Sequence, residues 1–222
     1  INKPFGLVTH PGAGNWSGTL ANALLHHDSQ LSSLDRAGIV HRLDKNTSGL
    51  MVVSKNAKSQ KFLVEQLQTH SVEREYSAIV YGHMISGDTI NEPIGRDPKD
   101  RVKQAVLING KEAITHYRAI DRFKSHTHVK AILETGRTHQ IRVHLSHKGY
   151  PLIGDPMYGG RVRFPKKACQ ELKDELKNFQ RQALHSKKLT LKHPVTGRSM
   201  TWKVDLPVDM QELLNTLKKY DS

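Results

Sequence analysis

The spacing of apolar residues along the chain predicts five helices. Apolar residues recur at intervals of three and four within 20–27, directly behind Thr19, a residue type that often caps a helix N-terminus. Asn56 and Thr138 are similar caps before two further stripes, and Gly149 stands where a left-handed residue would end the second of these. We predict helices over residues 19–27, 56–68, 138–147, 168–178 and 210–217.

Alternation of apolar and polar residues predicts a larger number of strands. The clearest alternation covers Glu73–Gly82, and Asn109–Gly110 is a hairpin signal between two further stretches of this kind. Gly87–Lys103 is rich in Gly, Pro and charged residues, and we predict an exposed connection there. The other strands are predicted over residues 7–9, 50–53, 104–108, 114–123, 128–134, 189–191 and 200–202. Strands outnumber helices, which favours an α+β fold: a single domain, residues 1–222, with a mainly antiparallel, mixed β-sheet flanked by helices.

The net charge of the chain indicates what kind of partner it binds. Among 222 residues there are 34 Lys and Arg against 21 Asp and Glu, which gives a formal net charge of +13. An excess of this size favours a polyanion, because Lys and Arg neutralise phosphates and release their counterions. Nucleic acid is therefore the first partner to consider, beside the alternative of a basic protein with no such role.

Other features exclude several classes of protein. The one cysteine, Cys169, rules out a disulfide framework and fits a reducing cytosol. No stretch approaches the roughly 18 apolar residues of a membrane span, and no signal peptide is visible, so we predict a cytoplasmic protein without membrane attachment. His139 and His144, like the other histidine pairs, lack the spacing with an acid that a zinc hydrolase motif shows, which makes a metal nuclease a weak alternative.

The decamer His41–Leu50 holds the strongest chemical signal. Its carboxylate, Asp44, stands between the cations Arg42 and Lys45 and is followed by small polar residues and a glycine that suit a tight turn. An apolar run comes directly afterwards, so the acid is expected on a loop held by the core. From composition and spacing alone, a turn residue or one half of a surface ion pair is the favoured interpretation of Asp44.

This decamer resembles the signature motif of the RluA-class pseudouridine synthases. Further segments resemble the same family in the same order and together cover most of the chain: 2–4 with 10–14, 74–76, 133–144 and 154–160. The segment His10–Gly14, together with residues 22–26, is most similar to the RluD branch, whose members modify large-subunit ribosomal RNA. The resemblance implies the fold of that family, a bent sheet flanked by helices.

The resemblance implies that Asp44 is the catalytic carboxylate, as nucleophile or base. It also implies that Arg142 is the partner that keeps Asp44 ionised, because an adjacent guanidinium lowers the pKa of an acid whereas burial raises it. Tyr76 matches a tyrosine that stacks on the flipped uracil and can assist removal of the carbon 5 proton. Whether Asp44 attacks the anomeric carbon or carbon 6 of the base, or generates a glycal, is left open by the sequence.

Other residues are implied in RNA binding. Arg42 fills the space that a flipped base vacates, or alternatively pairs with a phosphate. The segment Arg137, Thr138, His139 and Gln140 is expected to orient phosphates or the base edge.

The resemblance also implies what the protein works with. The expected partner is a stem-loop of large-subunit ribosomal RNA; isomerisation requires no metal and no cofactor, and we expect a monomer. Such enzymes usually carry a small N-terminal RNA-binding domain, and no segment of this chain corresponds to it. Two alternatives are a synthase of the same class acting on another ribosomal or transfer RNA site, and a non-catalytic RNA-binding or ribosome-assembly protein.

Overall fold

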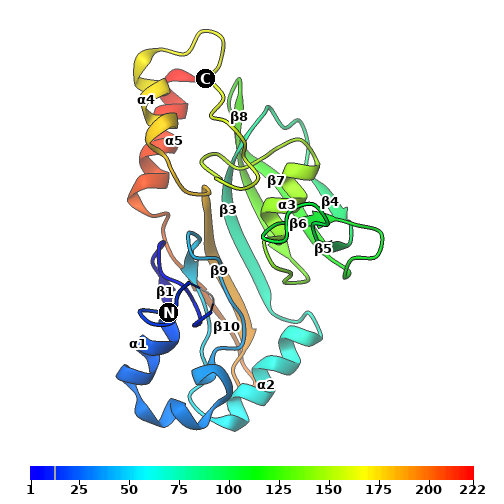
Figure 1. Cartoon of the computed structure of the whole chain (residues 1–222), viewed down its shortest axis with the longest axis vertical. Helices are drawn as coiled ribbons and strands as arrows, with labels where there is room; N and C mark the ends of the chain where they lie inside the picture. The colour runs from blue at the N-terminus through cyan, green and yellow to red at the C-terminus, as the bar shows by residue number, and fades with distance from the viewer. Residues whose placement is uncertain (13) are drawn as a thin grey trace. The chain divides into compact units, whose positions relative to one another are not determined.

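The fold is described from a computed structural model that covers residues 1–12 and 14–222. Ala13, which belongs to the predicted turn after Pro11, lies outside the described residues. The chain forms two compact units. Unit 1 comprises Ile1–Arg74 and Ser186–Val204, and unit 2 comprises Glu75–His185 and Asp205–Ser222. The divisions fall inside strands β3 (Glu73–Tyr81) and β9 (Leu184–Lys192), the two long strands labelled in Figure 1.

Unit 1 combines two helices with a small sheet. In this unit the strand order is β1-β2-β9, with β10 paired to β9, and the β1–β2 and β9–β10 pairs are antiparallel. Besides β9, its elements are β1 Asn2–Lys3, α1 Leu20–His27, the 3-10 helix η1 Ser29–Ser33, the short turn η2 Asp35–Gly38, β2 Ser48–Leu50, α2 Ala57–Gln68 and β10 Ser199–Lys203.

The helices of unit 1 begin where their caps predict. The Thr19 hydroxyl accepts from the Asn22 N–H while the Asn22 side chain accepts from the Thr19 N–H, which satisfies two otherwise unpaired donors of α1. Asn56 caps α2 by accepting from the Ser59 N–H at 2.9 Å. The apolar face of α2 packs on the sheet in one buried cluster: Leu50, Leu63, Val72, Leu189 and Leu191.

Unit 2 has the larger sheet, in the order β3-β8-β7-β4, and a separate antiparallel pair β5–β6. Its remaining elements are β4 Asp88–Asn91, β5 Ile94–Arg96, β6 Gln104–Val106, β7 Ile114–Arg122, β8 His126–Leu133, α3 Gln140–His147, α4 Gln170–Asn178 and α5 Val208–Tyr220. Figure 1 shows α4 and α5 side by side, and their apolar faces form the main core of this unit with Ile79, Tyr81 and Ile153. A second cluster, Ile94, Ala113 and Val143, buries one face of α3.

The predicted α+β fold with a mainly antiparallel sheet is confirmed, but several boundaries are wrong. Leu7–Thr9 is not a strand, because the carbonyls of Val8 and Thr9 accept from the first N–H groups of α1. The predicted strand at 50–53 begins where β2 ends. The supposed connection Gly87–Lys103 contains β4 and β5, and β6 pairs with β5 rather than forming a hairpin with β7.

None of the helices in residues 1–12 and 14–222 combines the length and the apolar composition that crossing a membrane requires.

Candidate active site

The loop that carries Asp44 is fastened to unit 1 through its backbone. The Thr9 hydroxyl donates to the Leu43 carbonyl at 2.9 Å, and the Thr47 N–H closes a turn on the Asp44 carbonyl at 3.0 Å. The Leu43 side chain is buried, whereas Arg42 on one side is exposed and Asp44 on the other is half-buried. The buried Leu43 side chain therefore anchors the loop between two charged residues. This anchor fixes the position of Asp44 while its carboxylate stays partly exposed.

A buried ammonium group ties this loop to the start of the chain. Lys3 is only 1% exposed, and its Nζ donates to the carbonyls of Pro4 at 2.8 Å, Leu7 at 2.9 Å and Lys45 at 3.1 Å. Three carbonyl dipoles offset the cost of burying the charge. Because one of the three belongs to Lys45, the neighbour of Asp44, Lys3 fastens the Asp44 loop to the start of the chain. Apart from its place in a family segment, Lys3 carries no signal along the chain that predicts this role.

Gly49 is required by a close approach of two strands. Its φ of +111° lies in the left-handed half of conformational space, and a Cβ at this position would stand 2.2 Å from the Ser186 carbonyl oxygen. The Ser186 hydroxyl in turn donates to the Leu50 carbonyl at 3.0 Å. The glycine predicted to serve a turn therefore serves the packing of β2 against β9, directly behind the Asp44 loop.

His41 is held as a neutral imidazole. Its Nε2 accepts from the Val52 N–H at 3.0 Å, which requires an unprotonated nitrogen. Burial, and after it the positive charge of Arg74, lowers the pKa of His41 from 6.5 to about 3. The first residue of the decamer is thus a structural acceptor at neutral pH.

In unit 2 the predicted RNA-binding segment leads into α3. The residue before the helix is His139, in a left-handed conformation with φ +58°, and not the predicted cap Thr138. Thr138 is exposed and makes no capping hydrogen bond to α3. Gly149 does take the predicted left-handed conformation after the helix, with φ +84°.

The Gln140 side chain holds the frame of this segment. Its Oε1 accepts from the Thr135 hydroxyl at 2.8 Å and from the Arg137 N–H at 2.9 Å. Its Nε2 donates to the Ile114 carbonyl and to the Thr115 hydroxyl, both at 2.9 Å. With 3% exposure and all four hydrogen bonds made within unit 2, the amide is committed to structure, which favours a positioning role over contact with RNA.

Arg142 is buried and fixed in orientation by Asp155. The guanidinium Nε and Nη2 donate to the two carboxylate oxygens at 2.7 and 2.9 Å, and the two side chains are 5% and 0% exposed. Arg142 is therefore an interior residue of unit 2 and not a surface residue of α3. Burial alone would raise the pKa of Asp155, but the hydrogen bonds and charge of Arg142 outweigh burial and hold that pKa below its usual value.

Asp155 is itself fixed by a tight turn. Its Oδ1 accepts from the N–H groups of Met157 and Tyr158 at 2.9 and 3.0 Å. Gly154 before it has φ +69°, and a Cβ there would stand 2.3 Å from the Arg181 carbonyl oxygen. Sequence reasoning quoted this glycine-rich segment but assigned Asp155 no role, although an aspartate directly after a glycine in such a turn was an available signal.

Tyr158 joins Arg142 to His139. The Arg142 Cζ lies 4.9 Å from the centre of the tyrosine ring, and the Tyr158 hydroxyl lies 2.8 Å from His139 Nδ1 while it accepts from the Gln104 N–H. Tyr158 was also missed from the sequence. It makes His139 and Arg142 parts of one cluster in unit 2.

The remaining predicted residues are distributed over both units. Arg137 is half-buried and donates from Nε to the Glu112 carbonyl at 2.7 Å. Tyr76 lies in β3 with 5% exposure. Tyr76, Arg137, Thr138, His139, Gln140 and Arg142 belong to unit 2, whereas Arg42 and Asp44 belong to unit 1.

A second arrangement in unit 2 has the donor order of a hydrolase triad. Ser77 Oγ lies 2.7 Å from His128 Nε2, and His128 Nδ1 lies 2.9 Å from Asp121 Oδ2. Ser77 is 1% exposed inside the sheet, however, so a substrate carbonyl has no access to its hydroxyl. We assign this group to the cohesion of β3, β7 and β8.

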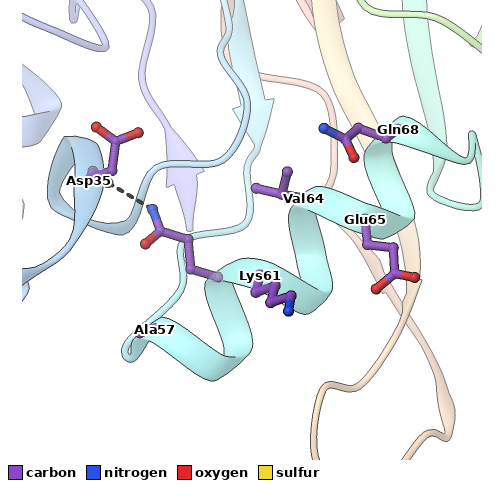
Figure 2. Close-up of a pocket in the computed structure, with 7 residues that line it drawn as sticks. Asp35, Ala57, Lys61, Val64, Glu65 and Gln68 are labelled. Atoms are coloured by element: carbon purple, nitrogen blue, oxygen red, sulfur yellow. Dashed lines mark hydrogen bonds between the residues drawn. The ribbon is translucent and has the colours of Figure 1, made fainter.

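A metal site and a groove along α2 are the other features that bear on function. Among the described residues no three His, Cys, Asp or Glu side chains gather as metal ligands. Figure 2 shows a shallow groove along α2, where Gln60 donates to the Asp35 carbonyl at 2.8 Å. It is lined by Asp35, Ala57, Gln60, Lys61, Val64, Glu65 and Gln68. One cation against two carboxylates does not suit a polyanion, and none of the predicted site residues lines this groove.

Comparison with known proteins identifies the class. Residues 1–147 match the family model for RNA pseudouridylate synthase, and the chain belongs to this family. It is 56% identical over 219 residues to the ribosomal large subunit pseudouridine synthase D of Pseudomonas aeruginosa, covering 99% of this chain and 68% of that protein. The protein of the same name from Escherichia coli K12 is 52% identical over 218 residues, covering 98% and 67%.

Solved structures agree on the fold. Human RNA pseudouridylate synthase domain containing 4 superposes with a TM-score of 0.75 at 27% identity, covering 98% of this chain and 88% of that one. Human RNA pseudouridylate synthase domain containing 1 gives a TM-score of 0.69 at 23% identity, covering 93% and 79%, and supports the fold alone.

Proposed function

We propose that this chain converts uridine to pseudouridine in large-subunit ribosomal RNA, with Asp44 as the reacting carboxylate. Membership of the synthase family supports the reaction, and the names of the relatives from P. aeruginosa and E. coli support the substrate. We propose that the chain acts in the cytoplasm, where such a substrate is found. The observation in the structure that carries the proposal is Arg142, a buried cation with a fixed orientation in a family segment.

The reaction is an isomerisation without a redox step. The bond between the ribose C1′ and N1 of uracil breaks, the base turns, a bond forms between C1′ and C5, and the C5 proton leaves as N1 gains one. In our proposal Asp44 begins this sequence as nucleophile, at C1′ or at C6, or as the base that forms a glycal. No metal or cofactor takes part, and we propose that the protein acts as a monomer.

Arg142 is proposed to hold Asp44 in its ionised form. Asp155 already offsets the charge of the guanidinium, so the contribution of Arg142 to Asp44 is mainly a directed hydrogen bond rather than a net positive field. A directed donor of this kind keeps the carboxylate oriented but still reactive. Asp155 is then a positioning residue, since it acts through Arg142.

The other residues contact the RNA in this proposal. Tyr76 stacks on the flipped uracil and assists removal of the C5 proton. Arg42, exposed beside Asp44, fills the space of the flipped base or pairs with a phosphate. Arg137, Thr138 and His139 contact the phosphates around the target.

The test uses Asp44→Asn beside the parent protein. The parent should form pseudouridine in a large-subunit ribosomal RNA stem-loop, in the presence of EDTA as well as in its absence. The variant should bind the same RNA with a Kd within about twofold and should form none. Equal modification by both proteins would remove Asp44 from the chemistry.

The substrate is tested separately in cells. Pseudouridines should disappear from large-subunit ribosomal RNA when the gene is deleted and return when it is restored. Loss confined to transfer RNA would move the target, and loss from no RNA, with binding intact in vitro, would favour an assembly protein.

A further inference from the structure

Two consecutive non-glycine residues in unit 1 adopt a left-handed backbone. Arg36 has φ +52° and ψ +37°, Ala37 has φ +52° and ψ +36°, and Gly38 follows with φ +79°. Only two other non-glycine residues in the described chain have a positive φ. Such a backbone is unfavourable for a non-glycine residue and persists only where the surrounding structure enforces it, and conformations of this kind cluster at functional sites.

The surrounding structure does enforce the turn at Arg36. The Gly38 carbonyl accepts from both the N–H and the hydroxyl of Ser54, at 2.9 and 2.8 Å. A Cβ on Gly38 would stand 2.1 Å from the Ser54 carbonyl oxygen. The Ala37 side chain is buried, so the turn is anchored on one side and directs Arg36 to the other, where its side chain is 68% exposed.

The same framework carries the Asp44 loop. Ile39 pairs with Val53, and His41 accepts from the Val52 N–H, so the segment after the turn runs along one rigid neighbour. Three residues, 39–41, separate the turn from Arg42. Arg36 and Arg42 are thus two exposed guanidinium groups at the two ends of one short, supported segment.

His10 lies close enough to both Arg36 and Arg42 to be influenced by their positive charges. The Thr9 hydroxyl bonds to the Leu43 carbonyl, which brings His10 to the Asp44 loop. The pKa of His10 is lowered by burial first and then by the positive charges of Arg36 and Arg42, while Asp35 opposes them. The Asp35 carboxylate lies 3.7 Å from Arg36 Nε, but both side chains are largely exposed, so this ion pair is weak and a stronger anion can replace it.

We propose that Arg36, held in this left-handed turn beside His10 and Arg42, binds a phosphate of the RNA strand next to the nucleotide that reacts at Asp44. The inference rests on the proposed function for its ligand. The planar guanidinium matches phosphate oxygens, and the neutral His10 imidazole adds a hydrogen-bond donor. The backbone strain is retained because a relaxed turn would direct Arg36 elsewhere.

Two variants of opposite sign test the proposal, with Arg198→Gln as the matched control. Arg198 is an exposed arginine of unit 1 outside this group. Arg36→Gln should raise the Kd for the stem-loop RNA about fivefold to tenfold and lower the slope of log Kd against log salt by about one, whereas the control should change neither as much. Asp35→Asn should lower the Kd about twofold, a gain that misfolding cannot imitate. Equal effects of Arg36→Gln and Arg198→Gln, or no tightening by Asp35→Asn, would overturn the proposal.

A proton titration tests the proximity directly. In Arg36→Gln the pKa of His10, followed by NMR, should rise because a positive neighbour is lost, and in Arg198→Gln it should stay. An unchanged pKa of His10 in Arg36→Gln would show that Arg36 does not lie near His10.

Turnover separates this proposal from the proposed function. Arg36→Gln should raise KM more than it lowers kcat, and Arg36→Lys should restore part of KM, whereas Asp44→Asn abolishes turnover. If the parent protein forms no pseudouridine, the proposed function is contradicted. The Kd values of Arg36→Gln and Arg198→Gln relative to the parent still decide whether Arg36 contacts phosphate.

Discussion

Asp44 and Asp155 are two aspartates of one family motif set, and the structure holds them in opposite ways. The backbone on either side of Asp44 is fixed by hydrogen bonds from Thr9 and Lys3, and the Asp44 side chain is half-buried between two exposed cations in the chain. The Asp155 side chain is fully buried, bonded to Arg142 through both oxygens, and has a lowered pKa. A reacting carboxylate needs room for a substrate, whereas a positioning carboxylate needs every oxygen engaged. The comparison therefore separates the acid proposed for chemistry from the acid that builds its surroundings.

Asp155→Asn should give the largest change in stability. The substitution keeps the shape but removes the carboxylate that balances the buried Arg142 charge, which typically costs about 3–5 kcal/mol of unfolding free energy. Asp44→Asn should change stability by less than about 1 kcal/mol while it abolishes activity, by about a thousandfold or more. Chemical denaturation of both variants measures the contrast.

A double variant sharpens this test. Adding Arg142→Met to Asp155→Asn removes the buried charge that Asp155 balanced, so the double variant should recover part of the stability that the single one loses. If the two losses simply add, the buried pair is not the reason for the effect.

Lys3→Met should rank next. It leaves the carbonyls of Pro4, Leu7 and Lys45 without the ammonium donor, at a cost of about 2–3 kcal/mol. Because one of these carbonyls adjoins Asp44, kcat should fall as well, even under conditions where the variant is fully folded. Lys55→Met, at an exposed position of the same unit, is the control. A stable variant with a normal kcat would show that Lys3 does not position the loop.

His41 of unit 1 and Asp155 of unit 2 should affect the stability of the protein in different pH ranges. His41 has a lowered pKa, so below its unfolded value of 6.5 the unfolded chain binds a proton that the native chain does not, and stability falls toward pH 3 by at most about 1.4 kcal/mol per pH unit. His41 is not fully buried, which reduces this maximum. Asp155 contributes stability that is lost only as pH falls below its unfolded value of 3.8.

The variant His41→Gln isolates the first window. The glutamine oxygen can still accept from the Val52 N–H, but the side chain does not titrate. The stability of the variant relative to the parent should therefore rise as the pH falls from 6.5 to 4. Denaturation at a series of pH values measures this difference. A constant difference over that range would show that His41 is not held neutral by the fold.

The sequence predicted best what depends on neighbouring residues. Asn56 and Thr19 cap α2 and α1 as expected, because a cap and its first turn lie within four residues. Leu7–Thr9 failed as a strand because distant groups use its backbone, and the β5–β6 pair was missed because pairing is a tertiary choice.

The site follows the same division. Asp44, Tyr76 and Arg142 could be named through family resemblance, but Asp155 became visible only when the fold brought it to Arg142. The left-handed backbone of Arg36 contradicts its local preference, so no pattern along the chain could have predicted it.

The smallest expected effect concerns Tyr158, which contacts both Arg142 of the buried Arg142–Asp155 pair and His139 of the predicted RNA-binding segment. Tyr158→Phe removes the hydroxyl that accepts from the Gln104 N–H and bonds to His139, and it keeps the ring beneath Arg142. We expect a loss of about 1 kcal/mol in unfolding free energy, the usual contribution of such a hydrogen bond. The Kd for RNA should rise about twofold, because His139 loses its orientation, while kcat should fall little, because Asp155 still fixes Arg142. A large fall in kcat with an unchanged Kd would mean that Tyr158, and not Asp155 alone, sets the guanidinium, and the contrast between the two aspartates would then have to include the ring that lies beside them.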